Sequence, residues 1–539
     1  MSTSTSTDVL IVGAGPVGLV SAIVLTKNGL SVRIVDKESK YAIGMRGAGI
    51  HPRTLESYHI LGIVRDIQAA GSEFHPVLEH DHEGKPGKTF HMVPKGEPTP
   101  DTPYASTLCV PQDAHSAALR SVLQGLGVKI ELGKELVRLE QNDAGVTATL
   151  NVSGEEEVVN AKYLLGTDGA KGVTRKLAGI NFLGESKQDI GMLIGDVEMS
   201  GPDRKVWHKF QDARGNWLMA YPRHDSETVF FVASFGPDLD ISRTASDHNL
   251  LKEWVHSLSK DSSIEVGKTV ALGEWRLNVR MADDFRAGRV LLAGDAAHVH
   301  APTAAQGLNS GVMDAMNLCW KLALVCSTRA PQKILDSYML ERGPTIADML
   351  AFTSKLAAAQ FNKAGAKDES FRRPPSVQQL GVHCRWSSLV LDEVHGPWDE
   401  TGRDGAYDGD SSKTRELHAG DRAPDAPGLV RLGSDGISTR LFDIFSAVRH
   451  TILVFDESLA RTIHAREDAR TIVILPRGKD LAEASNSDGL EVYQDVEGYA
   501  HAVYGPMPKV VAVRPDGVVG GIVKGLSGLT DYFARLYAA

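Results

Sequence analysis

The chain has 539 residues, of which 42% are hydrophobic and 23% are charged, and its formal net charge is -10. A chain of this length exceeds what one hydrophobic core organises, so we expect two or three domains. The acidic balance argues against a nucleic acid or an anionic membrane as a partner, because neither is attracted to a negative surface.

The first residues and the cysteines bear on the compartment. Residues 1–7 are a polar Ser/Thr tail without positive charge, and the apolar run after them is short and broken by glycines. We therefore expect neither a signal peptide nor a membrane span. No metal-ligand spacing occurs among the four cysteines, Cys109, Cys319, Cys326 and Cys384. These features predict a reduced, cytoplasmic protein without a metal site.

A glycine-rich turn follows the first predicted strand. The strand covers residues 8–12, a helix runs to about Asn28, and a second strand, residues 32–35, ends in Asp36. In such a unit the helix N-terminus binds a pyrophosphate and the acid binds ribose hydroxyls. Because Asp36 disfavours a 2′-phosphate, the unit predicts FAD or NAD; the alternative is a glycine-rich turn without a ligand. The predicted contacts are Gly13, Gly15, Pro16, Val17, Gly18, Asp36 and Lys37.

Further along, the composition predicts sheet structure. Antiparallel strands are expected at residues 128–132, 136–141 and 146–152, and again at 192–199, 217–222 and 228–235. The later set would form the floor of a pocket for a flat apolar ligand. Residues 71–103, which are rich in Pro, Gly and His, are expected to cover that pocket.

Residues 290–325 carry the most specific signal. A short apolar run, residues 290–293, predicts a buried strand that ends at Gly294 and Asp295. A carboxylate held there suits a polyol hydroxyl, because a charge-assisted hydrogen bond is strong. The alternative is a buried strand that ends in an Asp-capped turn.

A loop of small residues and a helix follow this strand. The loop contains Pro302, and from Gln306 the apolar residues recur at helical spacing. The first turn of this helix, which includes Gly307, Leu308 and Asn309, offers free N–H groups and the positive end of a helix dipole. Such a terminus would bind an anion or an electron-rich heterocycle.

The whole stretch resembles the flavin-binding segment of the FAD-dependent aromatic hydroxylases. These are the single-component flavoprotein monooxygenases that include p-hydroxybenzoate and phenol hydroxylases. The residues that match are Gly294-Asp295-Ala296-Ala297-His298, Pro302, Gln306-Gly307-Leu308-Asn309, Asp314-Ala315, Asn317-Leu318 and Trp320-Lys321-Leu322-Ala323.

Two other segments resemble the same family. Asp168 and Gly169 end a predicted strand, with Arg175 beyond them, and the resemblance implies that they contact FAD and the reducing nicotinamide. It also implies that Arg46 reaches the flavin and that Gln112 touches its chain. The alternatives are a solvated arginine and an ordinary polar residue in a helix's first turn. One departure is Gly172, where the family usually has serine.

The resemblance implies a mixed α/β (α+β) fold with three parts. An FAD-binding, Rossmann-like domain would comprise residues 1–75, 104–178 and 280–360, and an inserted antiparallel-sheet substrate domain residues 76–103 and 179–279. A connecting segment, 361–419, would lead to a thioredoxin-like C-terminal domain, 420–539. That last domain contains no cysteine and no flavin motif, so we expect it to serve packing or homodimer contact and not the chemistry.

The implied function is an FAD-dependent monooxygenase. It would hold FAD non-covalently and use NADPH or NADH and O2 to hydroxylate a small phenolic substrate through a flavin C4a-hydroperoxide. No second G-x-G-x-x-G follows a predicted strand, so NAD(P)H would visit the flavin transiently. The alternatives are another flavin reaction, such as Baeyer–Villiger-type oxygenation or dehydrogenation, and a non-enzymatic FAD-binding regulator.

Pocket residues follow from the same resemblance. Against p-hydroxybenzoate hydroxylase, Arg223 matches the arginine that binds the substrate carboxylate, and Phe210 and Phe231 match two pocket tyrosines. With Pro302 these are the predicted catalytic residues. Where phenol hydroxylase has its catalytic aspartate, this chain has Ala48. The pattern predicts a hydroxybenzoate, hydroxylated with or without loss of CO2; the alternative is that Arg223 solvates a hairpin turn.

Overall fold

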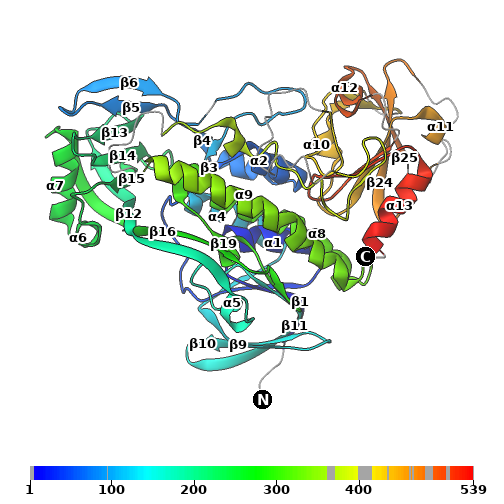
Figure 1. Cartoon of the computed structure of the whole chain (residues 1–539), viewed down its shortest axis with the longest axis horizontal. Helices are drawn as coiled ribbons and strands as arrows, with labels where there is room; N and C mark the ends of the chain where they lie inside the picture. The colour runs from blue at the N-terminus through cyan, green and yellow to red at the C-terminus, as the bar shows by residue number, and fades with distance from the viewer. Residues whose placement is uncertain are drawn as a thin grey trace.

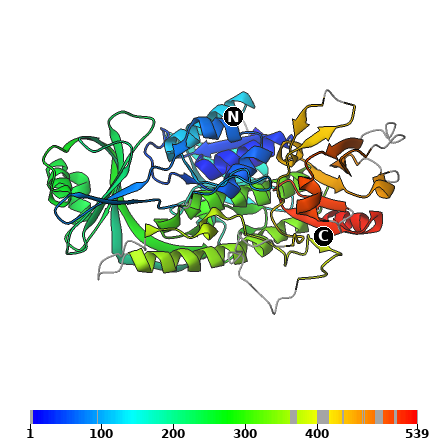
Figure 2. The same cartoon turned by 90° about the horizontal axis from the view of Figure 1, so that it is seen from above.

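The computed structural model describes residues 5–93, 95–360, 371–398, 416–433, 436–460, 463, 466–479, 490–505 and 510–537. These residues form three eight-stranded sheets and one small sheet. The molecule is elongated, with the second sheet at one end and the third at the other (Figure 1, Figure 2). Two long helices, α8 (Gln306–Cys326) and α9 (Asp336–Gln360), run through the middle.

The first sheet carries the dinucleotide turn. Its order is β17-β18-β11-β1-β2-β8, with β10 paired to β11 and β9 paired to β10, and the pairs from β18 to β8 are parallel. The strands are β1 (Thr5–Val12), β2 (Val32–Asp36), β8 (Ile130–Leu132), β9 (Lys134–Gln141), β10 (Val146–Val152), β11 (Glu155–Gly166), β17 (Arg286–Ala287) and β18 (Val290–Leu292).

Register in this sheet positions the predicted cofactor motifs. Val12 pairs with Gly166, and Gly166 pairs with Leu292, so β1, β11 and β18 end side by side. The three predicted cofactor turns, each of which follows one of these strands, therefore meet at one edge of the sheet. The antiparallel prediction for residues 128–132 was wrong, because β8 pairs parallel with β2.

Helices cover this sheet. The strongly apolar α1 (Pro16–Lys27) is buried from Gly18 to Leu25, as expected for a helix with protein on both sides. The others are α2 (Pro52–Ile60), α3 (Val64–Ala69), α4 (Gln112–Gly125) and α5 (Thr174–Leu177). A small antiparallel sheet, in the order β3-β7-β4, consists of β3 (Gly49–Ile50), β4 (Ser72–Glu73) and β7 (Leu108–Cys109).

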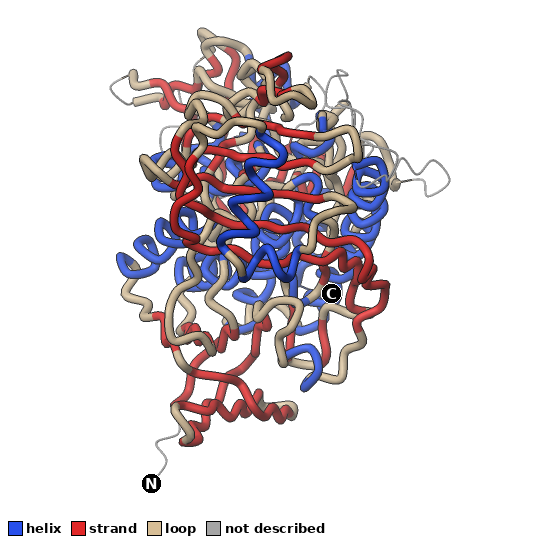
Figure 3. The backbone as a smooth tube through the Cα atoms, turned by 90° about the vertical axis from the view of Figure 1, so that its left-hand side faces the viewer, coloured by secondary structure: helices blue, strands red, loops and turns tan. Residues whose placement is uncertain are grey.

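The second sheet has the order β19-β16-β12-β15-β14-β13-β5-β6. All its pairs are antiparallel except β13 with β5. The strands are β5 (Val77–His80), β6 (Pro86–Phe90), β12 (Phe182–Ser200), β13 (Trp207–Gln211), β14 (Trp217–Pro222), β15 (Val229–Phe235), β16 (Glu265–Ala282) and β19 (His298–Val299). Helix α7 (His248–Ser259), preceded by α6 (Ile241–Ser246), lies across the outer face (Figure 3).

The third sheet lies in the C-terminal part of the chain, with the order β20-β27-β26-β23-β24-β25-β21-β22. Its strands are β20 (Leu391–Asp392), β21 (Leu429–Arg431), β22 (Ser438–Thr439), β23 (His450–Val454), β24 (Ala469–Pro476), β25 (Leu490–Asp495), β26 (Val510–Val513) and β27 (Val519–Val523). The helices are α10 (Leu441–Ile444), α11 (Glu457–Ala460), α12 (Tyr499–Tyr504) and α13 (Leu526–Tyr537).

The fold is the expected mixed α/β arrangement. The domain boundaries and the thioredoxin-like assignment stay predictions, and residues 361–370 and 399–415 of the predicted connecting segment lie outside the described residues. All four cysteines are buried and free. Within the described part of the chain, no helix combines the length and apolar character needed to cross a membrane.

Candidate flavin and substrate site

The turn after β1 is shaped for close approach of a ligand. Gly13 has φ +106°, and a Cβ there would lie 2.4 Å from the Thr167 carbonyl oxygen, so only glycine fits. A Cβ on Gly15 would meet nothing within 4 Å, which leaves open space at the N-terminus of α1. That space and helix end suit a pyrophosphate.

The remaining residues of this motif fix the turn. Pro16 is in the first turn of α1, Val17 lies close to Gly294, and Gly18 is buried against Gly13. Asp36 Oδ2 accepts the N–H of Ala14 at 2.8 Å, and Oδ1 accepts that of Glu38 at 2.9 Å. The half-buried Asp36 carboxylate still has lone pairs for ribose hydroxyls, whereas Lys37 beside it is exposed.

Asp168 leaves one oxygen open. Its Oδ2 accepts the N–H and the hydroxyl of Thr174, both at 2.9 Å, while Oδ1 is buried and has no partner among the described residues. A Cβ on Gly172 would lie 2.2 Å from the Asp168 carboxyl carbon. A side chain at position 172, such as the serine usual in the family, would clash with the Asp168 carboxylate. Glycine at this position therefore lets the carboxylate lie where it does. Gly169, next to it, has φ +76° and open space around its Cα.

Arg175 joins two of the motifs. Its guanidinium donates to the Ala296 carbonyl at 2.8 Å and to the Ala170 carbonyl at 3.2 Å, and it lies 3.7 Å from the centre of the Phe182 ring. Burial lowers the pKa of this arginine, although it remains a cation. Arg175 thus clamps the segment after β11 to the segment after β18.

A buried ion cluster holds the turn that bears Asp295. Asp314 accepts the N–H of Gly294 at 3.1 Å and pairs with His298 and Arg342, both at 2.7 Å. Burial opposes the charge on Asp314, but His298 and Arg342 outweigh it and lower the pKa of this carboxyl to about 2. Asp314 and Arg342 were not among the predicted site residues; the Asp-Ala pair of the resemblance was the available signal.

Asp295 combines two properties that identify its surroundings. The residue is exposed to solvent, yet desolvation by surrounding protein raises the pKa of its carboxyl, an effect that His298 opposes. Both hold if the carboxylate faces a recess inside the molecule and not its outer surface. That position suits a hydrogen bond to a ligand hydroxyl.

At the start of α8, two predicted side chains bind protein and not an open site. Buried Gln306 donates to the Val377 carbonyl at 2.9 Å. Buried Asn309 accepts the backbone N–H of His51 at 2.8 Å and donates to the Gly49 carbonyl at 2.7 Å. The N-cap residue, Ala305, supplies no side-chain cap. The ligand cradle predicted here would therefore consist of backbone N–H groups.

Three neighbours complete this end of the site. A Cβ on Gly307 would lie 2.8 Å from His300 Nε2, and Leu308 packs against the core. Pro302 begins a single 3₁₀ turn (Pro302–Ala304) and is half-buried. His51 and His300, which the sequence reading missed, have pKa values lowered to about 4 by burial.

The segments that bear Arg46 and Gln112 lie side by side. The backbone N–H of Gln112 donates to the Met45 carbonyl at 3.1 Å. Arg46 is exposed and has φ +45°, a conformation that costs energy for a residue with a side chain. The segment is held by Asp113 and Asp196, whose carboxylates accept the N–H groups of Gly44 and Met45, each at 2.8 Å.

Arg223 belongs to this support. It is buried, and it donates to Asp113 at 3.0 and 3.1 Å, to Asp196 at 2.7 Å and to Asp225 at 2.6 and 2.9 Å. These contacts occupy its whole fork of donors. The geometry gives no support to pairing with a substrate carboxylate, and we infer that Arg223 holds the loop that bears Arg46.

An apolar face of the second sheet lies toward the flavin segments. Phe231 belongs to it, whereas Phe210 points to the opposite side, where it stacks 4.3 Å from His80 and packs with α7. Because side chains alternate along a strand, the two predicted residues cannot line one pocket. The buried apolar cluster on this face, which we call the substrate face as the candidate wall of a substrate pocket, comprises Met45, Val77, Phe90, Cys109, Met192, Trp207, Trp217, Met219, Tyr221, Phe231, Ala233, Leu277, Ala301, Ala357 and Phe371.

A family model described as an FAD binding domain matches residues 6–353. A flavin-dependent monooxygenase of Mycobacteroides abscessus is 34% identical over 452 residues, covering 83% of this chain and 88% of that protein. The chain belongs to the FAD-dependent aromatic monooxygenases. The monooxygenase therefore binds FAD, and NAD(P)H is the co-substrate typical of its family.

Two further similarities cover nearly the full length. The anhydrotetracycline monooxygenase of Streptomyces rimosus is 28% identical over 97% of both chains. The crystal structure of aklavinone-11 hydroxylase with FAD and aklavinone has a TM-score of 0.80 and 25% identity over 100% of both chains. The third sheet thus also has a counterpart in the relatives.

Proposed function

We propose that this monooxygenase hydroxylates an extended, polycyclic phenolic substrate. The observation that carries the proposal is the width of the substrate face, whose side chains come from β16, β12, β15, β14 and β13 in turn. Four strand spacings of about 4.8 Å amount to about 19 Å, several times the width of one aromatic ring. The names of the tetracycline and aklavinone relatives support the same substrate class.

Two tryptophans supply polar anchors on this face. The indole Nε1 atoms of Trp207 and Trp217 are buried and have no hydrogen-bond partner among the described residues. A buried donor without an acceptor costs about 1–3 kcal/mol, which a ligand oxygen would offset. Phenol and carbonyl oxygens along a polycyclic substrate are acceptors of the right kind.

The charge around Arg223 argues against a hydroxybenzoate. Asp113, Asp196 and Asp225 already neutralise this arginine, so a substrate carboxylate would meet like charges. We therefore favour a neutral or phenolate substrate over the small aromatic acid that the sequence suggests. Decarboxylative hydroxylation requires such an acid, so the contacts of Arg223 do not support it either.

The protein's part in the reaction is binding and electrostatics. FAD supplies the redox and oxygen chemistry when bound. Asp36 and Asp295 would hold its hydroxyls, the open space at Gly15 would admit its pyrophosphate, and the N-terminus of α8 would stabilise negative charge near Gly307. The apolar substrate face would exclude water from the reacting atoms. NADH or NADPH would reach this site transiently. The enzyme would be cytoplasmic and would form a homodimer.

A phenol series tests the proposal. Phenols of one to four fused rings are scored for stimulated NAD(P)H oxidation and for a product heavier by one oxygen. We expect three- and four-ring phenols to stimulate at least tenfold more than hydroxybenzoates. Equal turnover of a single-ring acid would contradict the substrate class, and a product without added oxygen would favour dehydrogenation.

Phe231→Ala and Phe210→Ala form a matched pair for the same series. Both remove a buried phenylalanine from the second sheet, but only Phe231 lies on the substrate face. We expect the Phe231 variant to raise KM for a polycyclic phenol about tenfold and the Phe210 variant to lower stability with KM kept. The reverse pattern would place the pocket on the α7 side.

A further inference from the structure

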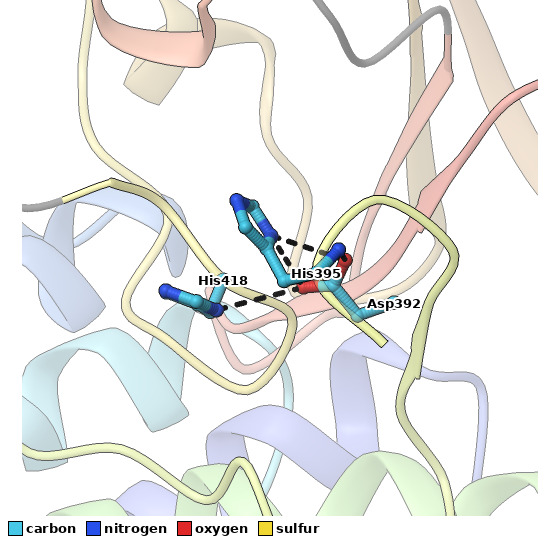
Figure 4. Close-up of side chains that lie close together, drawn as sticks. All are labelled: Asp392, His395 and His418. Atoms are coloured by element: carbon cyan, nitrogen blue, oxygen red, sulfur yellow. Dashed lines mark hydrogen bonds and ion pairs between the residues drawn. The ribbon is translucent and has the colours of Figure 1, made fainter. Parts of the chain in front are cut away.

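Two histidines and an aspartate meet at the edge of the third sheet (Figure 4). Asp392 ends β20, His395 lies in the turn that follows, and His418 lies on the segment that returns after residues 399–415. Asp392 joins the two segments, because Oδ1 accepts the N–H of His395 at 2.9 Å and Oδ2 accepts the N–H of Ala419 at 3.0 Å.

The side chains converge on the Asp392 carboxylate. His395 Nδ1 lies 3.1 Å from Asp392 Oδ2, and His418 Nδ1 lies 3.9 Å from the same atom. The imidazole centroids are 4.1 Å apart, with their planes inclined at 41°. One potential ligand atom from each of the three residues lies within 4.8 Å of the others.

The geometry points to a binding site for a Zn²⁺-type divalent cation at Asp392, His395 and His418. Two imidazoles and a carboxylate are a donor set that zinc favours, with bonds of about 2.0–2.2 Å. In a tetrahedral site such bonds place ligand atoms about 3.3 Å apart. Small side-chain rotations would therefore bring the three donors to a shared ion.

The surroundings supply the second observation. Glu416 Oε2 lies 3.6 Å from His395 Nε2, the ring nitrogen that faces away from Asp392. A metal-binding histidine characteristically donates its other N–H to a carboxylate, which orients the ring. The cation of Arg385 is balanced by Asp421, with which it forms two hydrogen bonds of 2.6 and 2.7 Å. Asp392 and Glu416 thus leave net negative charge for a dication.

The site would act as a clip between two segments of the C-terminal part. One segment forms β20, which pairs with β27, and the other begins the stretch whose Gly420 N–H donates to the Val519 carbonyl. An ion that binds only the folded chain stabilises it by mass action, so the clip would raise the melting temperature.

Metal binding to the tag-free, FAD-loaded full-length protein tests this site. After chelator treatment, Zn²⁺ is titrated by calorimetry, and Co²⁺ is followed by the visible absorption of a tetrahedral complex. We expect one site per chain, and Zn²⁺ should raise the melting temperature. His395→Ala and His418→Ala should each weaken binding at least a hundredfold, and Glu416→Gln about tenfold.

His248→Ala is the matched control, because His248 is exposed and lies outside the cluster. It should bind Zn²⁺ like wild type. If either cluster variant fails to fold, His395→Gln or His418→Gln replaces it. Wild-type protein without a stoichiometric site, or equal Zn²⁺ affinity in the double variant of His395 and His418, would overturn the assignment.

Discussion

The two ends of helix α8 lie in opposite kinds of polar environment. At its start, the flavin motifs leave polar groups open, such as the carboxylate of Asp295, an exposed residue, and Asp168 Oδ1, which has no partner in the described structure. Further along, Lys321 lies fully buried, and Glu341 accepts its Nζ at 2.8 Å. The buried charges that support the fold here are paired with one another, whereas the oxygens of the flavin motifs keep hydrogen-bonding capacity for a ligand.

The buried network around Lys321 and Glu341, which we call the closed region, extends to the third sheet. Glu341 also accepts two hydrogen bonds of 2.8 Å from Arg514, and Arg514 pairs with Asp516 at 2.5 Å. Burial opposes ionisation of Glu341, but Arg514 and Lys321 hold the pKa of its carboxyl well below the usual range. The helix that begins at the flavin site is thus anchored by the C-terminal part, although that part contains no flavin motif.

Arg514→Met should have the largest effect on this comparison. It leaves Asp516 without its buried partner, and removing one member of such a network costs about 3–5 kcal/mol. We expect a large fall in the denaturant midpoint and loss of FAD with unfolding. Arg449→Met, an exposed arginine on the same part of the chain, should change neither. A stable Arg514 variant that keeps FAD would contradict the anchoring role inferred for this network.

Arg223→Met tests whether Arg223 supports the fold or binds a substrate carboxylate. Because three carboxylates would lose their partner, we expect about 3 kcal/mol of destabilisation and slower reduction of FAD by NAD(P)H through displacement of the loop at Arg46. KM for aromatic acids should change little more than KM for neutral phenols. A selective rise in KM for the acids, with normal stability, would restore the carboxylate-binding role predicted from the sequence.

Burial of His450 in the closed region should make the stability of the folded protein sensitive to acid. Burial, and then the charge of Arg514, lower the pKa of His450 to about 3, so the folded protein disfavours its cation. The unfolded chain takes up this proton below about pH 6.5, so stability falls from that pH downward, by about 2 kcal/mol at pH 5.

His450→Phe removes this proton uptake and keeps the ring contacts with Trp320 and Phe533. Thermal unfolding at pH 7 and pH 5 should show a smaller loss than in wild type. His91→Phe, at an exposed histidine, should leave the pH dependence as it is. An unchanged pH dependence in the His450 variant would contradict the assignment.

Asp295→Ala tests the open region and should have the smallest effect on stability. Loss of a charged hydrogen bond to FAD costs about 1.5–3 kcal/mol, or about one to two decades in affinity. Flavin fluorescence after dialysis measures the loss, and Asp143→Ala, at an exposed turn, is the control. Retention of flavin like that of wild type would remove Asp295 from the site.

Local sequence predicted much of the fold and of the geometry of the candidate flavin site. The strands that end at Val12, Gly166 and Leu292, and the helices that start at Pro16 and Gln306, lie where apolar runs and turn residues indicate. Such signals are local, because a buried strand needs consecutive apolar residues and a tight turn needs glycine. The grouping of Asp36, Asp168 and Asp295 follows from parallel strands that end together.

Which partner each polar side chain selects was decided only by the tertiary structure. Arg223 resembles a substrate-binding arginine, but Asp113 and Asp196 come from distant elements and occupy it. Phe210 and Phe231 are both matched to pocket tyrosines by the sequence, and only strand register places them on opposite faces of the sheet. His395 and His418 meet because β20 pairs with β27. The sequence determines local conformation, whereas contacts between distant segments depend on packing, which no short stretch encodes.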